Sequence, residues 1–227
     1  MTPAVPALGP GVVPVDKPAG WTSHDVVAVV RRGLPKGTKV GHAGTLDPMA
    51  TGLLLLLIGP ATKRAQELQG LDKTYSGTIR LGVETESGDA TGAVVKEAPV
   101  PAVTAEELKA LFARLVGKRV LPVSRYSAMK VGGKALYKYA HRGETAPEVK
   151  REMETTFWDL TSWESPEVGF RLGCVSGTYV RSLAVLVGQE LGCGATLSSL
   201  RRETVGAWSV PETPFDPKTF KYEPTPV

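Results

Sequence analysis

Six consecutive apolar residues, 53–58 (LLLLLI), constrain the fold of this 227-residue chain more than any other feature. A membrane-spanning helix needs roughly 20 apolar residues, so this run is far too short to cross a bilayer. Its length is instead typical of a strand buried within a sheet. The segment before it, residues 41–52 (GHAGTLDPMATG), places three glycines and one proline among polar side chains. The sequence therefore predicts a glycine-rich loop that leads into a central strand.

Strands and helices are predicted elsewhere without a regular alternation. Period-two patterns and apolar runs predict strands over residues 12–15, 73–81, 153–163 and 168–175, with a long acidic loop from the second of these to about residue 101. Ser23 is predicted to cap a first helix, and Thr104 with Glu107 forms the capping box of a second. A third helix is expected over residues 179–191. This order predicts a mixed α/β (α+β) fold.

The two ends of the chain have the composition of loose segments. Residues 1–11 contain three prolines and two glycines, and residues 211–227 contain five prolines. Such segments rarely pack into a core of their own. We expect a flexible arm over residues 1–11, one folded domain over 12–210, and a proline-rich tail or surface strap over 211–227.

Positive charge is concentrated in one segment. Residues 118–151 contain nine Lys or Arg against two Glu, whereas the net charge of the whole chain is only +4. The segment also carries Tyr126, Tyr137 and Tyr139 among glycines. A charged stretch is often no more than a solvated surface. Cations interleaved with aromatic rings, however, are the groups that bind phosphates and stack on unpaired bases of RNA.

Several classes of protein are not expected. The two cysteines, Cys174 and Cys193, are too few for a disulfide framework, and three histidines without a CxxC motif supply no zinc-ligand spacing. The N-terminus has no basic segment followed by an apolar one, as a secretory signal would. We therefore expect a reduced, cytoplasmic setting, with no metal and no membrane association.

The glycine-rich loop carries the first candidate for chemistry. Asp47 precedes Pro48, which favours an extended backbone, and the glycines around it allow another chain to approach closely. An Asp in this position also commonly does no more than cap a turn. Tyr75, Tyr179 and Arg181 have equally ordinary alternatives, as core aromatics and a solvated cation. Their spacing alone leaves both interpretations open.

Motifs along the chain resemble, in order, those of the TruB family of bacterial tRNA pseudouridine synthases. They are residues 16–23 (DKPAGWTS), 41–52 (GHAGTLDPMATG), 73–75 (KTY), 126–130 (YSAMK) with Gly133 and Tyr137, 177–181 (GTYVR) and 200–202 (LRR). The resemblance runs from about Val12 to Trp208. It implies a pseudouridine synthase fold, with a largely antiparallel central sheet, flanking helices and a basic RNA-binding insertion over about residues 124–151.

The resemblance also implies an activity. Uridine 55 in the T loop of tRNA would be isomerised to pseudouridine without metal or organic cofactor. The N1–C1′ bond must break, the uracil must turn, and C5 must be joined to C1′, for which an ionised carboxylate can serve as nucleophile or base. By resemblance this carboxylate is Asp47. Whether it attacks C1′, adds to C6 or removes the 2′ proton stays open.

Further roles follow from the same resemblance. Arg181 would pair with Asp47, and Tyr75 would pack on the target base. Tyr179 and Leu200 would line the same pocket, and His42 would fill the space that the flipped base leaves. The T stem-loop would be bound by a set of cations, Lys130, Lys134, Lys138 and Arg202.

The tail and the partners complete these expectations. Relatives usually continue into a C-terminal RNA-binding domain of the PUA type, and about 20 residues after Trp208 are too few for one. Recognition is therefore expected to depend on the T arm of tRNA, with no obligatory protein partner or guide RNA.

Three other classes of function fit the sequence less well. A tRNA-binding folding helper would not need Asp47, Tyr75 and Arg181 together. An enzyme of the archaeal and eukaryotic type, which works inside a guide-RNA particle, would be expected to carry extensions and a PUA domain. A glycosidase would need a second carboxylate roughly 5 to 9.5 Å from Asp47, and the matching motifs offer none.

Overall fold

The computed structural model describes residues 11–127, 129–140, 142, 144–145, 147–212 and 215–216. Most of the predicted N-terminal arm and of the proline-rich tail lie outside these residues. The chain forms two compact units, which are Met1–Tyr75 with Leu200–Val227 and Ser76–Ser199. We refer to them as the first and the second unit. Two strands, β4 (Lys73–Leu81) and β12 (Ala195–Val205), contribute residues to both.

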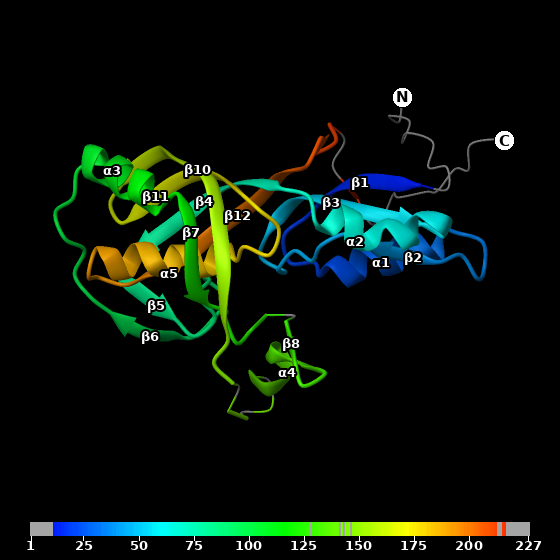
Figure 1. The fold of residues 1–227 in the computed structure, drawn as a ribbon, viewed down its shortest axis with the longest axis horizontal. Helices are drawn as coiled ribbons and strands as arrows, with labels where there is room; N and C mark the ends of the chain where they lie inside the picture. Colours follow the sequence, from blue (N-terminus) through cyan, green and yellow to red (C-terminus); the bar gives the residue numbers. More distant parts are fainter. Residues whose placement is uncertain are drawn as a thin grey trace. The chain divides into compact units, whose positions relative to one another are not determined.

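The first unit is built around the predicted apolar strand (Figure 1). Its elements are β1 (Val12–Lys17), α1 (Ser23–Arg32), β2 (Val40–His42), β3 (Thr51–Ile58), the 3-10 helix η1 (Gly59–Arg64), α2 (Ala65–Gln69), the end of β12, and β13 (Trp208–Ser209). β3 pairs antiparallel with β1 and β2 and parallel with β12. This strand is therefore central, as the sequence predicts.

Both faces of β3 are covered, which explains the uninterrupted apolar run. Leu54, Leu56 and Ile58 pack in one cluster with valines of β1 and α1. Leu53, Leu55 and Leu57 pack in a second cluster with Leu68 of α2 and Val205 of β12. None of these six residues of β3 is more than 2% exposed. Each such burial contributes about 1.5 to 3 kcal/mol, so the strand holds the loop before it on a rigid base.

The first helix begins one residue earlier than the sequence predicts, because Thr22 and not Ser23 is its N-cap. The Thr22 hydroxyl accepts a hydrogen bond from the Asp25 backbone N–H at 3.1 Å, and the Asp25 carboxylate accepts one from the Thr22 N–H at 2.9 Å. The Ser23 hydroxyl is engaged elsewhere, with the backbone of Leu46. Gly33 closes the helix as expected.

The second unit contains an antiparallel arrangement of long strands. Its strand order is β12-β4-β11-β10-β7, with β7 (Gly117–Pro122), β10 (Lys150–Glu164) and β11 (Glu167–Cys174). Helix α3 (Ala105–Leu115) packs on β10, where the Phe112 and Trp158 rings stack with centroids 4.7 Å apart. Helix α5 (Val180–Glu190) follows β11. The predicted mixed fold with a mostly antiparallel sheet is confirmed, and β3 and β12 form a parallel pair within it.

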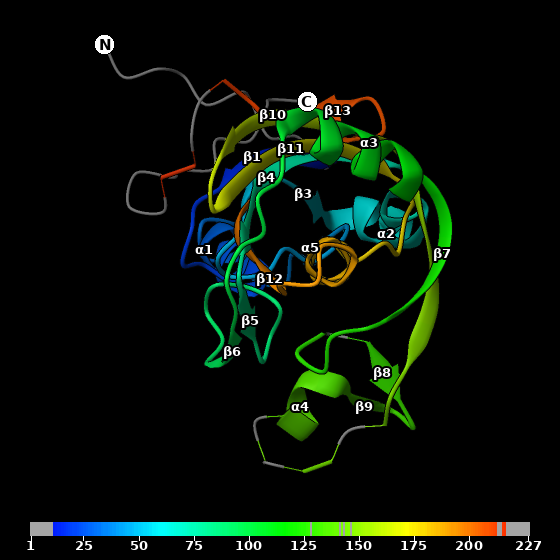
Figure 2. The ribbon, with the colours of Figure 1, turned by 90° about the vertical axis from the view of Figure 1, so that its left-hand side faces the viewer.

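Two small hairpins complete the second unit (Figure 2). The first consists of β5 (Val83–Thr85) and β6 (Val94–Glu97) and occupies part of the segment predicted as an acidic loop, so that prediction was incomplete. The second consists of β8 (Lys130–Val131) and β9 (Lys134–Ala135) and is followed by α4 (Leu136–Ala140). Both views show it at the ends of β7 and β10, inside the predicted insertion.

Candidate active site

Asp47 lies in the loop between β2 and β3, and its side chain is partly exposed. The loop begins where the Ala43 N–H donates to the Leu55 carbonyl at 2.9 Å and turns where the Ala50 N–H donates to the Asp47 carbonyl at 3.0 Å. Gly44 has a φ of +90°, a conformation that favours glycine. The loop is therefore a defined turn attached to the buried strand.

Lys17 fixes the loop from the end of β1. Its side chain is 0% exposed, and its ammonium group donates to the backbone carbonyls of Pro18, Trp21 and Pro48 at 2.9, 2.7 and 3.3 Å. Three acceptors match the three donors of an ammonium group. Burial lowers the pKa of Lys17 from 10.5 to about 8, and the negative charge of Asp47 opposes that shift. The charge of Asp47 therefore acts on the pKa of Lys17. Lys17 in turn binds the carbonyl of Pro48, the residue that follows Asp47.

Arg202 fixes the same loop from β12. Its side chain is 1% exposed and donates to the carbonyls of Leu53, Gly44 and Thr45 at 2.7, 3.1 and 3.5 Å. All three acceptors lie at the start of β3 or in the loop that carries Asp47. The structure thus places Arg202, predicted as a substrate contact, inside the fold with its donors engaged by backbone.

A third attachment comes from α1. The Ser23 hydroxyl accepts from the Leu46 N–H at 2.9 Å and donates to the Leu46 carbonyl at 3.2 Å. Lys17, Ser23 and Arg202 therefore hold the residues before and after Asp47 from three different elements. A further ion pair, between Asp16 and Arg201 at 2.9 Å, joins β1 to β12 at the residues that directly precede Lys17 and Arg202. Such support is what keeps a reacting group in one orientation.

His42 is the last residue of β2 and directly precedes the loop that carries Asp47. Its side chain is partly exposed, but its Nδ1 atom is buried and has no hydrogen-bond partner. Burial, followed by the positive charges of Arg202 and His24, lowers the pKa of His42 below 6.5. The imidazole is therefore neutral at neutral pH, which suits contact with a flat, uncharged base.

Two apolar candidates belong to the first unit as well. Tyr75 of β4 is 7% exposed, and Leu200 of β12 is 8% exposed. The first unit thus contains Asp47, His42, Tyr75 and Leu200. Tyr179 and Arg181 belong to the second unit, so the predicted pairing of Asp47 with Arg181 stays a prediction.

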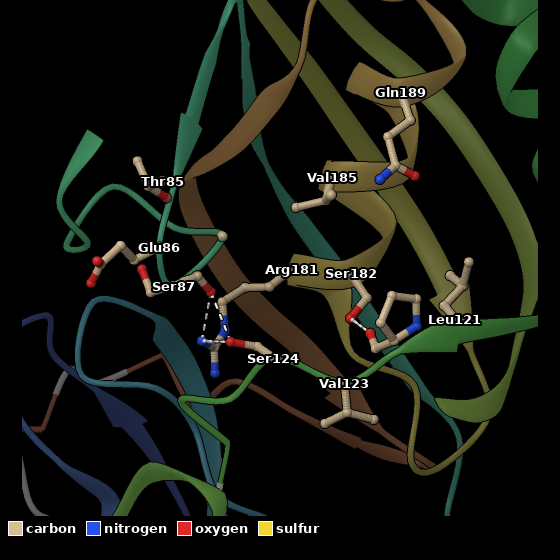
Figure 3. Close-up of a pocket in the computed structure, with 12 residues that line it drawn as sticks. Thr85, Glu86, Ser87, Leu121, Val123, Ser124, Arg181, Ser182, Val185 and Gln189 are labelled. Carbon is tan, nitrogen blue, oxygen red and sulfur yellow. Dashed lines mark hydrogen bonds between the residues drawn. The ribbon is translucent and has the colours of Figure 1, made fainter. Parts of the chain in front are cut away.

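Arg181 enters a buried polar network in the second unit (Figure 3). Its guanidinium donates to the Ser87 carbonyl at 3.0 Å and to the Ser124 hydroxyl at 3.2 Å, and lies 3.5 Å from a carboxylate oxygen of Asp89. The side chains of Arg181 and Asp89 are only 6% and 5% exposed. Beside Arg181 lies a pocket of about 170 Å³ between the loop after β5, the end of β7 and α5.

Asp89 is itself held in place. Its other carboxylate oxygen accepts from the hydroxyls of Ser87 and Thr91 at 2.8 and 2.5 Å and from the Thr91 N–H at 3.0 Å. The Ala90 N–H donates to the Leu197 carbonyl on β12 at 2.9 Å. Asp89 can therefore orient Arg181 at the start of α5, where Tyr179 is the N-cap residue.

The three predicted lysines of the insertion differ in their surroundings. Lys130 and Lys138 are exposed. Lys134 forms an ion pair with Glu144 and lies over the Tyr139 ring, with its ammonium nitrogen 3.9 Å from the ring centroid. Lys134 thus contributes to the internal structure of the insertion, whereas Lys130 and Lys138 are accessible.

Sequence reasoning missed Lys17, Ser23 and Asp89 as supports of the site. Each is polar and buried, and each bonds to a residue distant in the chain, so no local pattern marks it. The motif at residues 16–23 does contain the first two, and that is the one signal that could have found them.

Within the residues that the structure describes, no group of three or more His, Cys, Asp or Glu side chains is placed to hold a metal ion. In the same part of the chain, no helix has the length and apolar character needed to span a membrane.

Comparison with known families gives this site its context. The family model described as TruB family pseudouridylate synthase (N terminal domain) matches residues 31–180. These residues include the loop of Asp47, the Arg181 neighbour Asp89, and the insertion. The chain belongs to the TruB family of pseudouridylate synthases, which are isomerases.

Two similar proteins are both named tRNA pseudouridine synthase B. The one from Opitutus terrae is 50% identical over 192 residues, which cover 85% of this chain and 79% of the relative. The one from Xanthomonas campestris pv. campestris is 45% identical over 202 residues, which cover 89% of this chain and 65% of the relative. The chain therefore spans only part of the length of these relatives.

Two solved structures share the fold. A Cbf5-Nop10-Gar1 complex contains a chain that superposes with a TM-score of 0.69 at 28% identity, covering 91% of this chain and 52% of that one. An H/ACA RNP bound to a substrate RNA containing 2′-deoxyuridine gives a TM-score of 0.66 at 27% identity, covering 91% and 50%. This chain corresponds to about half of each.

Proposed function

We propose that this chain isomerises uridine 55 in the T loop of tRNA to pseudouridine, with Asp47 as the catalytic carboxylate. The observation that carries the proposal is the attachment of the Asp47 loop by Lys17 and Arg202, two fully buried cations that bond to loop carbonyls. Burying two cations for a surface loop is costly unless the loop must hold one geometry. Membership of the TruB family supplies the reaction class.

The chemistry is an isomerisation, so every atom of the uridine except one exchanged proton is retained. The N1–C1′ bond breaks, the uracil turns, a C5–C1′ bond forms, the proton on C5 leaves to solvent, and N1 takes up a proton from solvent. A partly exposed carboxylate can act on the sugar or on the base in this sequence. The carboxylate of Asp47 interacts electrostatically with the buried ammonium group of Lys17.

The other residues have roles that suit what surrounds them. Tyr75 and Leu200 offer buried apolar surface for the uracil, and the neutral ring of His42 can stack where the base was removed from the loop. Flipping a base costs a few kcal/mol, which such stacking partly offsets. Arg181 would orient Asp47 and is itself oriented by Asp89. Tyr179 begins the same helix. Arg202 acts as a positioning residue.

The substrate is the T stem-loop of tRNA. Lys130 and Lys138, exposed on the insertion, would bind its phosphates, with Lys134 shaping the hairpin that presents them. The proposal assigns the activity to this chain without a guide RNA or a protein partner. The solved Cbf5-Nop10-Gar1 complex, by contrast, contains Nop10 and Gar1 as well as Cbf5.

The proposal is tested by tritium release from uridine labelled at C5 in a T-arm hairpin, with the purified chain alone. Wild type is expected to release tritium, and Asp47→Asn is expected to release none while binding the hairpin as tightly as wild type. Release by Asp47→Asn would overturn the role of Asp47. Absence of release by wild type from both the hairpin and full-length tRNA would overturn the activity and favour a tRNA-binding folding helper.

A further inference from the structure

A second concentration of positive charge lies in the first unit, outside the insertion. Residues 26–66 contain six Lys or Arg and a single carboxylate, Asp47. Apart from Arg31, whose guanidinium donates to the Val40 carbonyl, four of these cations are exposed and have no carboxylate within ion-pair distance among the described residues. They are Arg32, Lys36, Lys39 and Lys63, which we call the basic edge.

The fold brings the basic edge together around β2. Arg32 ends α1, Lys36 and Lys39 lie in the loop from α1 to β2, and Lys63 lies in the last turn of η1. The Arg31 guanidinium donates to the Val40 carbonyl at 3.0 Å, and the Gly59 N–H donates to the Lys39 carbonyl at 2.8 Å. Figure 1 shows α1 and β2 side by side in this unit.

The loop that carries Lys36 is rigid. The Thr38 N–H and hydroxyl both bond to the Pro35 carbonyl, at 3.1 and 2.7 Å, and Gly37 has a φ of +92°. These are the features of a type II turn, with Lys36 at its second position and glycine at the third. The backbone that carries Lys36 is therefore already fixed, so less conformational entropy is lost when its ammonium group binds an anion.

The insertion is more strongly neutralised than the basic edge. Four of its seven cations lie within 4.0 Å of a carboxylate, namely Arg125, Lys134, Arg142 and Lys150. Unpaired cations attract phosphates without first losing an internal partner. The basic edge also adjoins β2, the strand that ends at His42. An RNA whose base reaches the His42 region would have its backbone beside these cations.

We infer that the basic edge binds the phosphate backbone of the substrate tRNA, as a second RNA contact surface in addition to the insertion. This inference rests on the proposed function for the identity of the RNA. The contacts are to phosphates and not to bases, because the surface consists of exposed cations, three of them lysines with their charge at the end of a flexible stem. Such contacts position an RNA and contribute affinity, but they do not read its sequence.

The test compares two triple variants, each in an Asp47→Asn chain so that the RNA stays unmodified. Lys36→Gln with Lys39→Gln and Lys63→Gln removes three charges from the basic edge. The control is Arg80→Gln with Lys96→Gln and Lys109→Gln. It removes three exposed charges that lie outside the basic edge and are each paired with a carboxylate. Dissociation constants for an unmodified tRNA transcript are measured from low to high salt.

For the basic-edge variant we expect binding at least about tenfold weaker at low salt, and a log–log salt slope smaller by about 2, as for three lost phosphate contacts. The control variant should keep the slope of its Asp47→Asn parent. The preference for this transcript over one with an altered T loop should be the same in both. An unchanged slope in the basic-edge variant, or a loss of that preference, would overturn the inference.

This outcome is separable from the proposed activity. Binding is measured at equilibrium and needs no turnover, so a reduced slope would support the RNA surface even if wild type released no tritium. Conversely, tritium release by wild type together with an unchanged salt slope in the basic-edge variant would support the activity and exclude the basic edge as an RNA contact surface.

Discussion

The ammonium group of Lys17 donates a hydrogen bond to the carbonyl of Pro48, the residue after Asp47, at 3.3 Å. The same group bonds to Pro18 and Trp21, on the segment that leads into α1. One buried cation therefore joins two loops that are about 30 residues apart in sequence. Any change in its protonation alters a support of the candidate catalytic loop.

The first prediction concerns the pH dependence of stability at Lys17. Its pKa is about 8 in the folded chain and 10.5 in an unfolded one. Below pH 8 both states hold the proton, whereas between these values only the unfolded state does, so stability rises with pH. Relative to Lys17→Met, wild type should gain up to about 3 kcal/mol of unfolding free energy from pH 8 to 10.5.

Urea unfolding over this pH range measures that difference. Lys39→Met, which removes an exposed lysine, serves as the control and should give a flat difference from wild type. In an Asp47→Asn background the rise should begin at lower pH, because the charge of Asp47 raises the pKa of Lys17. A difference for Lys17→Met that is flat with pH would contradict the burial of a charged lysine.

The second prediction concerns Arg202. Arg202→Lys keeps the charge but has a single donor group in place of the planar fork that spans Leu53, Gly44 and Thr45. We expect a loss of about 2 to 4 kcal/mol in unfolding free energy, because buried carbonyls lose their donors. The single-turnover rate should fall while the dissociation constant for RNA changes little. An RNA affinity that falls with an unchanged rate would instead indicate direct contact with substrate.

The third prediction concerns the buried pair of Arg181 and Asp89. Asp89→Asn removes the negative charge that lies 3.5 Å from the buried guanidinium of Arg181, and losing one partner of a buried ion pair is costly. We expect single-turnover tritium release to slow by about 10- to 100-fold with little change in RNA affinity. Ser87→Ala is the matched control, since it removes a hydroxyl bonded to Asp89 but keeps the backbone carbonyl that accepts from Arg181. Equal rates for the two variants would argue against an orienting role for Asp89.

Elements with local signals were predictable from the sequence. The capping box of Thr104 and Glu107 fixed the start of α3, and the alternation over residues 73–81 matched β4. The apolar run of β3 predicted its burial because only a strand covered on both faces can hold six such residues. These signals lie within about ten residues, so they do not depend on the rest of the fold.

What could not be predicted depends on long-range partners. Thr22 and Ser23 are both good N-caps, and the choice between them follows from Leu46, which engages the Ser23 hydroxyl. Lys17 and Arg202 would ordinarily be expected on the surface. They are buried because carbonyls satisfy their donors, and some of these lie far away in sequence, Pro48 for Lys17 and Gly44 for Arg202. The β5–β6 hairpin lies within a stretch whose charge favoured a loop. The resemblance to the TruB family identified the loop of Asp47, and the structure adds the groups that hold it.

The last prediction concerns Gly52, where β3 meets β12 in parallel register with Arg202. Gly52 has a φ of +98°, and a Cβ atom there would lie 2.3 Å from the Arg202 carbonyl oxygen and 2.8 Å from its nitrogen. Both are backbone atoms that cannot turn aside, so Gly52→Ala must push β12 away from β3 and move the Arg202 guanidinium. Gly20→Ala is the control, because Gly20 also has a positive φ, +79°, but open space around it. We expect a loss of about 1 kcal/mol for Gly20→Ala and more than about 3 kcal/mol for Gly52→Ala, measured by urea unfolding. Tritium release should fall in the Gly52 variant even where it is fully folded, and equal effects of the two substitutions would show that β12 does not need this close approach to hold the loop of Asp47.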